Sequence, residues 1–262
     1  MVTLYLEYPE GLLLPTRYYL HPQHNTHVVL IGTIHVGEEN FYRQVDKILQ
    51  NCDTVIYEEP LIRDNAAMEQ LDHDGRQRLE QKGDLNDSFL AAIFLPMPPQ
   101  KFARDHGLVR ENRNFNYAQD HWVSGDGAWH SRAKEETELP DDTWEQIQDA
   151  IKTLPASIKR EKVKAAKAFL RKVNAGKASI QEYISFSNLH EKEILAKIYK
   201  HTLVDIRDQL AFEVFDNVIE TRAPACVGIK FGNGHLPGMD AELLTRGYRY
   251  IATMWLRILT IP

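Results

Sequence analysis

The chain has 262 residues, of which 43% are hydrophobic and 26% are charged, and this length is enough to bury a sizeable core. The formal net charge of −6 at pH 7 argues against a nucleic-acid-binding protein. The two cysteines, Cys52 and Cys226, are far apart in the sequence and predict neither a disulfide framework nor a metal-ligand pair.

The N-terminal part predicts a hairpin followed by a strand, a helix and a second strand. Residues 3–8 and 17–21 alternate like two hairpin strands, without the basic and apolar regions of a signal peptide. HVVLIG at 27–32 is continuously apolar, as expected of a strand that is covered on both faces. Residues 38–50 space their apolar side chains for a helix, and DTVIYEEP at 53–60 predicts another buried strand.

The middle of the chain, residues 61–223, is predicted to be largely helical. Helices are expected over 76–95 and 98–107, and RNFNYAQD at 113–120 predicts a short strand. No Gly/Ser-rich linker separates this segment from the rest. We therefore expect one α/β domain spanning 1–262, in which the helical insertion forms a lid.

The C-terminal part repeats the order of strand, helix and strand. ACVGIKFG at 225–232 predicts a strand, 239–246 a helix and 248–256 a final strand. The apolar run 250–261 is too short to cross a bilayer, so we expect a buried strand in a cytoplasmic protein without a membrane segment. Crossovers of this kind give parallel strands, and the predicted fold is α/β with a mixed, largely parallel sheet built from two such units.

Each unit places a histidine just beyond the end of its first strand, in GTIH and GNGH. Because ligands bind outside the carboxyl ends of parallel strands, His35 and His235 are expected to converge on one site. The glycines around them predict close approach of another group at strand ends, or turns with positive φ. These glycines are Gly32, Gly232, Gly234 and Gly238.

Two glutamates end the strand at 53–60. Side chains alternate along a strand, so Glu58 and Glu59 point to opposite faces and only one of them enters a given site. A carboxylate beside two imidazoles fits a metal site with an open water position. It fits equally a general base with a raised pKa.

Arg207 lies in an apolar stripe of the helix predicted over 193–220. An unpaired buried charge is costly, so this arginine requires a partner. One interpretation is a structural ion pair with a carboxylate. The other is a clamp on a substrate carbonyl or oxyanion.

These motifs together resemble the TraB/PrgY/TIKI superfamily. The resemblance rests on the paired GxxH motifs at 32–35 and 232–235, on Glu58 in DTVIYEE, and on the Arg207–Asp208 pair before the second motif. It spans about 27–60 and 203–239. It implies an α/β fold with both histidines at one cleft.

The resemblance also implies hydrolase chemistry. TIKI proteins are divalent-metal-dependent peptidases, for which Mn, Co or Zn are the candidate ions. Erythromycin-esterase-like relatives use a histidine and a glutamate without a metal, and ChaN-like relatives bind haem. TraB and PrgY members limit peptide-pheromone signalling.

The resulting expectation is a metallopeptidase-like or esterase-like hydrolase whose substrate is a peptide or a small amide or ester. His35, His235 and Glu58 hold the metal, and Arg207 stabilises the oxyanion. Asn233, Asp208 and Glu59 are the expected substrate-binding residues. The alternative is a non-catalytic protein that sequesters a peptide or small ligand, or carries haem or a metal, at the same place.

Overall fold

The computed structural model describes residues 5–8, 10–59, 77, 79, 84–94, 99–111, 114–127, 141–194 and 204–261. The chain divides into two compact units. A sheet unit comprises Met1–Pro60, Arg110–Pro140 and Leu203–Pro262, and a helical unit comprises Leu61–Val109 and Asp141–Thr202. The segment predicted as one helical insertion, 61–223, is therefore divided between the two units. Its residues 110–140 and 203–223 belong to the sheet unit, and the rest forms the helical unit.

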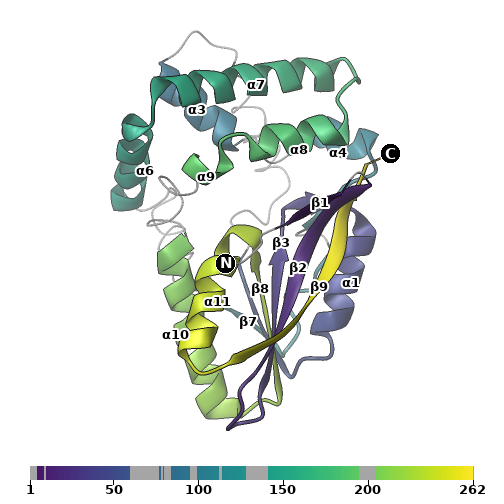
Figure 1. Cartoon of the computed structure of the whole chain (residues 1–262), viewed down its shortest axis with the longest axis vertical. Coiled ribbons are helices and arrows are strands. Elements are labelled where there is room, and N and C mark those ends of the chain that lie inside the picture. The colour runs from purple at the N-terminus through teal and green to yellow at the C-terminus, as the bar shows by residue number, and fades with distance from the viewer. Residues whose placement is uncertain are drawn as a thin grey trace. The chain divides into compact units, whose positions relative to one another are not determined.

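The sheet unit contains a seven-stranded mixed sheet in the order β1-β2-β3-β8-β5-β7, with β9 paired to β2 (Figure 1). Strands β3, β8, β5 and β7 are parallel, while β1, β2 and β9 add antiparallel pairs. The predicted α/β class with a largely parallel central sheet is confirmed. The strands are β1 (Leu6–Tyr8), β2 (Gly11–Leu20), β3 (His27–Thr33), β5 (Thr54–Tyr57), β7 (Trp122–Ser124), β8 (Cys226–Gly232) and β9 (Arg249–Thr260), with the short β4 (Val36–Gly37) and β6 (Val109–Arg110) apart from this sheet.

An N-terminal hairpin is present, but β1 pairs with Gly11–Leu13 and not with the predicted second strand 17–21, which belongs to the later part of β2 and pairs with β3. β2 starts at Gly11 and runs through Pro15, which the sequence analysis placed between strands. Strand β1 pairs with β2 as far as Leu13, and β3 pairs with it from Thr16 onward. On this side of β2, Pro15 lies between the two ladders, while on the other side it is opposite Trp255 of β9.

Helices cover both faces of the sheet. α10 (Asp205–Arg222) and α11 (Leu236–Thr245) pack on one face, and α1 (Glu39–Leu49) lies on the other (Figure 1). The alternation of side chains along β8 explains the two layers, since Ile229 and Phe231 join the core under α10 whereas Gly228 lies against Leu49 of α1. That core consists of Tyr19, Val28, Leu30, Ile56, Ala211, Phe212, Phe215, Val218, Val227, Ile229, Phe231, Leu236, Met239, Leu243 and Tyr248.

The helical unit has an aromatic core of its own. The rings of Phe169 and Phe186 stack at 5.4 Å between centroids, and Phe102 and Tyr183 pack beside Phe169. The described helices are α3 (Leu85–Phe94), α4 (Gln100–Asp105), α6 (Asp141–Thr153), α7 (Ala156–Asn174), α8 (Ile180–Asn188) and α9 (Glu191–Ile194). α3 and α4 fall within the predicted helices 76–95 and 98–107, while most of 76–83 lies outside the described residues.

The strand predicted over 113–120 is wrong. Residues 114–120 form turns, and the strand β7 begins only at Trp122. The aromatic residues that suggested a strand instead pack into a ring cluster, in which Tyr117 contacts both Tyr57 and Trp122. Their pattern reflects burial of aromatic surface rather than strand alternation.

The apolar C-terminal run forms a strand, as predicted, but only part of it is buried. β9 pairs with β2 at the margin of the sheet, and Tyr250 and Ile251 remain 45% and 57% exposed. The end of the strand, around Ile258 and Leu259, is fully buried. In the described ranges, no helix combines the length and apolar character required to cross a membrane.

Candidate functional site

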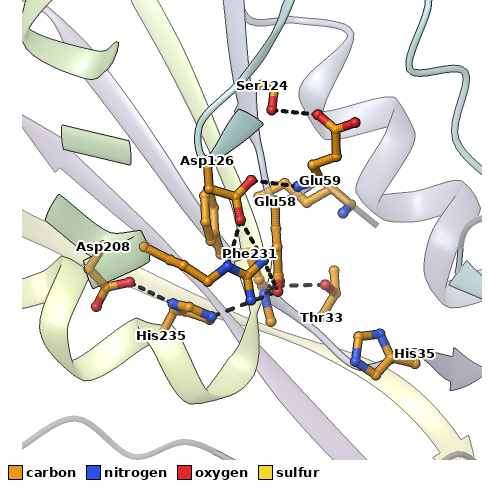
Figure 2. Close-up of polar contacts among 12 residues, drawn as sticks. Thr33, His35, Glu58, Glu59, Ser124, Asp126, Asp208, Phe231 and His235 are labelled. Atoms are coloured by element: carbon orange, nitrogen blue, oxygen red, sulfur yellow. Dashed lines mark hydrogen bonds and ion pairs between the residues drawn. The ribbon is translucent and has the colours of Figure 1, made fainter. Parts of the chain in front are cut away.

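Ionisable side chains gather at the carboxyl ends of the four parallel strands (Figure 2). These strands end at one edge of the sheet, where open α/β sheets bind ligands. Helix α10 brings two further charged residues to the same edge, Arg207 and Asp208. The residues from the strand ends are Thr33 of β3, Glu58 and Glu59 after β5, Ser124 and Asp126 at and after β7, and His235 after β8.

His235 lies between two carboxylates, in the single 3-10 turn Asn233–His235 that joins β8 to α11 (Figure 2). Its Nδ1 is 2.6 Å from Oδ1 of Asp208, and its Nε2 is 3.7 Å from Oε1 of Glu58. The short contact assigns the ring proton to Nδ1, because an ionised carboxylate only accepts. Burial raises the pKa of Asp208, although the hydrogen bond from His235 opposes this rise.

Glu58 is held as an ionised carboxylate. Its Oε1 is 2.8 Å from Nη2 of Arg207, and its Oε2 accepts the backbone N–H of Gly232 at 2.5 Å. Burial alone would raise the pKa of Glu58, but Arg207, and after it the histidines, bring the pKa far below its ordinary value. The interpretation of this residue as a general base with a raised pKa is therefore wrong.

Arg207 is buried, as the apolar stripe predicted, and it is paired on two sides. Besides Glu58, it contacts Asp126, whose Oδ2 accepts from the arginine Nε at 2.7 Å. Asp126 is fully buried and its Oδ1 accepts the backbone N–H of Glu59 at 2.8 Å. These contacts fit the structural interpretation of Arg207, because its guanidinium ties α10 to the ends of β5 and β7.

Glu59 points away from this group, in agreement with the alternation along β5. Its Oε2 accepts a hydrogen bond of 2.8 Å from the hydroxyl of Ser124. The glutamate therefore joins the ends of the neighbouring strands β5 and β7. Its predicted contact with substrate stays a prediction.

His35 lies apart from His235 and belongs to a second charged group (Figure 2). Its exposed ring places Nδ1 3.6 Å from Oε2 of Glu111. Oε1 of Glu111 in turn accepts from Thr33 Oγ1 and from Lys230 Nζ, each at 2.7 Å. The Glu111 carboxylate beside the ring raises the pKa of the His35 imidazole.

Lys230 is the centre of this second group. It is 1% exposed, and its ammonium also lies over the rings of Phe115 and Tyr117. Burial lowers the pKa of a lysine, but the charge of Glu111 outweighs burial and leaves the pKa of Lys230 raised. Burial alone would raise the pKa of Glu111. The charge of Lys230, and after it that of His35, outweighs burial and brings this pKa below its ordinary value.

The predicted metal ligands His35, His235 and Glu58 do not form a ligand set in this structure. Both carboxylate oxygens of Glu58 already have partners, Nδ1 of His235 faces Asp208, and His35 faces Glu111. Within the described part of the chain, no three His, Cys, Asp or Glu side chains are grouped so that they could hold a metal ion. These side chains do not fit the expected divalent metal.

Three of the four motif glycines, Gly32, Gly232 and Gly238, lie where an added Cβ would be in tight contact, whereas nothing lies within 4 Å of a Cβ added at Gly234. Neither Gly234 nor Gly238 is among the described glycines with positive φ. A Cβ on Gly238 would collide with Oδ2 of Asp208, and one on Gly32 would lie 2.5 Å from Oδ1 of Asn233. That Asn233 oxygen is buried without a hydrogen-bond partner in the described structure. The expected contact of Asn233 with substrate stays a prediction.

No family model and no curated protein matches this sequence. The resemblance to the TraB/PrgY/TIKI superfamily therefore stays a prediction. Two separate carboxylate–histidine contacts are the main chemical feature at the sheet edge.

Sequence reasoning missed three charged residues of the site. Lys230 interrupts the apolar strand ACVGIKFG, and a lysine inside a buried strand is a signal that was available. Glu111 and Asp126 lie in irregular segments without periodicity. Only the three-dimensional pairing with Lys230 and Arg207 identifies them.

Proposed function

We propose that this chain is a hydrolase of amide or ester bonds in which His235 is the general base that activates water. The observation that carries the proposal is the 2.6 Å contact between Asp208 and His235. With the proton on Nδ1, the lone pair of Nε2 is available to accept a proton. The nearest carboxylate to Nε2, Glu58, is 3.7 Å away, which is too long for a hydrogen bond.

The remaining residues support this role electrostatically. A water molecule would transfer a proton to Nε2 while its oxygen attacks the substrate carbonyl carbon, and the imidazolium would then protonate the leaving group. The carboxylates of Asp208 and Glu58 flank the ring and stabilise its positive charge. Glu58 is itself a weak base, because its pKa is far below neutrality.

The metal-dependent form of this hydrolase is not favoured by the donor geometry. A metal would have to displace Arg207 and the Gly232 amide from Glu58, and would still lack His35. We therefore expect turnover of a sensitive substrate to survive dialysis against EDTA. Loss of turnover that Mn, Co or Zn restores would contradict this expectation and support the metallopeptidase alternative.

The decisive experiment compares histidine variants on a panel of peptides and matched small esters and amides. His235→Gln is expected to lower turnover by at least about 10²-fold while the circular dichroism spectrum and Tm stay close to those of the parent. The matched control is His24→Gln, since His24 is an exposed histidine in the turn between β2 and β3. Unchanged turnover in His235→Gln would refute the proposal.

The panel also separates the two classes of function. Ligand binding without any turnover of the parent protein would favour the sequestering alternative. Retained binding of a substrate by the inactive His235→Gln variant would instead separate the catalytic role of His235 from substrate affinity.

A further inference from the structure

The only two cysteines of the chain meet at the end of the sheet opposite to the charged residues. Cys52 lies in the turn between α1 and β5, and Cys226 is the first residue of β8. Their Sγ atoms are 3.1 Å apart, although 174 positions separate them in the sequence. A disulfide bond needs about 2.05 Å, so an approach of about 1 Å would join them.

Backbone hydrogen bonds hold the two cysteines at this spacing. The N–H of Asp53 donates to the carbonyl of Cys226 at 3.0 Å. In return, Oδ2 of Asp53 accepts the N–H groups of Ala225 at 2.8 Å and of Cys226 at 2.9 Å. The two segments are thus connected next to the thiols on both sides, and the next residues begin the parallel β5–β8 ladder.

The environment of the pair distinguishes a first and a second reacting thiol. Cys226 is partly exposed, whereas Cys52 is buried against Ile48 of α1. The hydrogen bond between the thiols lowers the pKa of Cys226 and raises that of Cys52. A partly exposed thiolate reacts first in thiol–disulfide exchange, and a neighbouring thiol then resolves the mixed disulfide.

We propose that Cys52 and Cys226 form an intramolecular disulfide in the folded protein when a small disulfide such as oxidised glutathione is present. The thiolate of Cys226 attacks one glutathione sulfur and releases the first glutathione thiolate. Sγ of Cys52, after losing its proton, attacks Sγ of Cys226 and releases the second. The two protein thiols lose two electrons and two protons, and one glutathione disulfide becomes two glutathione thiols. This modification is independent of the proposed hydrolase activity.

The test treats the native, full-length protein with oxidised glutathione, blocks remaining thiols under denaturing conditions, and maps tryptic peptides without reduction. Linked peptides 48–63 and 223–230 are expected, and they should separate on reduction. Intact mass should fall by two hydrogens, with no blocking group and no glutathione attached. Two blocked thiols, or two separate glutathione adducts, would overturn the proposal.

Single variants and thermal unfolding complete the test. Cys52→Ser is expected to retain glutathione on Cys226, whereas Cys226→Ser should react slowly because Cys52 is buried. A crosslink closing this long loop in native geometry should raise the Tm of the parent by about 5–10 °C. A linked protein with a lowered Tm would show that the bond forms only after distortion of the fold, which would contradict the native-state proposal.

Discussion

Two histidines at one sheet edge have the same kind of partner but different environments. His235 is buried and its Nδ1 faces Asp208, while His35 is exposed and its Nδ1 faces Glu111. Pairs of titratable groups in contrasting environments are a common basis for dividing acid and base roles. The buried histidine has the firmer orientation, and for this reason the base is assigned to it.

Removal of one partner of the Lys230–Glu111 pair is expected to destabilise the fold strongly. Lys230→Met leaves the buried Glu111 carboxylate without its cation, and the free energy of unfolding should fall by about 3 kcal/mol or more. The double variant Lys230→Met/Glu111→Gln should lose less, since no unpaired charge remains. Urea unfolding measures the free energy of unfolding of the parent and of each variant. The control is Lys164→Met at an exposed position, whose free energy of unfolding should stay within about 0.5 kcal/mol of the parent. Equal stability of Lys230→Met and the parent would contradict the role of this pair.

The depressed pKa of Glu58 predicts how stability depends on acid. The unfolded chain protonates this carboxyl first, near pH 4.3, while the folded protein keeps it ionised. Its contribution is therefore complete above about pH 5 and is lost as the pH falls through the folded-state pKa. Urea unfolding between pH 7 and pH 3 should show a smaller loss of stability on acidification in Glu58→Gln than in the parent.

A surface glutamate provides the control for this acid dependence. Glu39→Gln removes the same charge at an exposed position of helix α1, where the carboxylate pairs only with Arg43 among the described contacts. Its acid dependence should follow that of the parent. If the free energy of unfolding fell equally with pH in Glu58→Gln and Glu39→Gln, the ionisation of Glu58 would contribute no more to stability than that of a surface glutamate.

At the scale of elements, the packing of α11 against α10 depends on one glycine. A side chain at Gly238 collides with Asp208, and Asp208 cannot move without losing its hydrogen bond to His235. Gly238→Ala is therefore expected to lower turnover by about tenfold or more, and to lower the Tm. Gly234→Ala is the matched control, because nothing lies within 4 Å of the added methyl group. Equal activity of the two variants would contradict this packing argument.

The elements that the sequence predicted are those in which one periodicity dominates. β3 is an apolar run, β8 is apolar except for Lys230, and α1 has a clear apolar stripe, so burial and local pattern agree. β7 has three residues and follows an aromatic segment, which left no distinct strand pattern. The exposure of β9 was likewise not predictable, because an apolar sequence does not specify whether a strand lies at the margin of a sheet.

The site residues that belong to the repeated motif could be predicted from the sequence. The residues that are identified only by contacts between distant segments could not. GTIH and GNGH identified His35 and His235. Their carboxylate partners could not be assigned, since Glu111 follows its histidine by 76 positions and Asp208 precedes its own by 27. Distances of this kind are set by the sheet order, which the local sequence does not encode.

At the scale of the whole molecule, each compact unit has its own core, and local opening should follow this division. Phe169→Ala removes the ring that stacks on Phe186, and amide exchange is expected to accelerate in α4, α7 and α8. The amides of β3 and β8 should keep the parent rates. Hydrogen exchange with mass spectrometry measures both sets, and Phe215→Ala in the sheet unit should give the reverse pattern. Uniform acceleration throughout the chain would show a single cooperative unit instead.

The position of β8 in the sheet has a consequence for how the protein is made. β8 is hydrogen-bonded to both β3 and β5, yet it is synthesised after them and after both segments of the helical unit. Until β8 leaves the ribosome, the facing edges of two apolar strands have no partner, and such edges promote aggregation. Incomplete chains that end before Cys226 would expose both edges permanently, which makes them natural clients for chaperones and proteases.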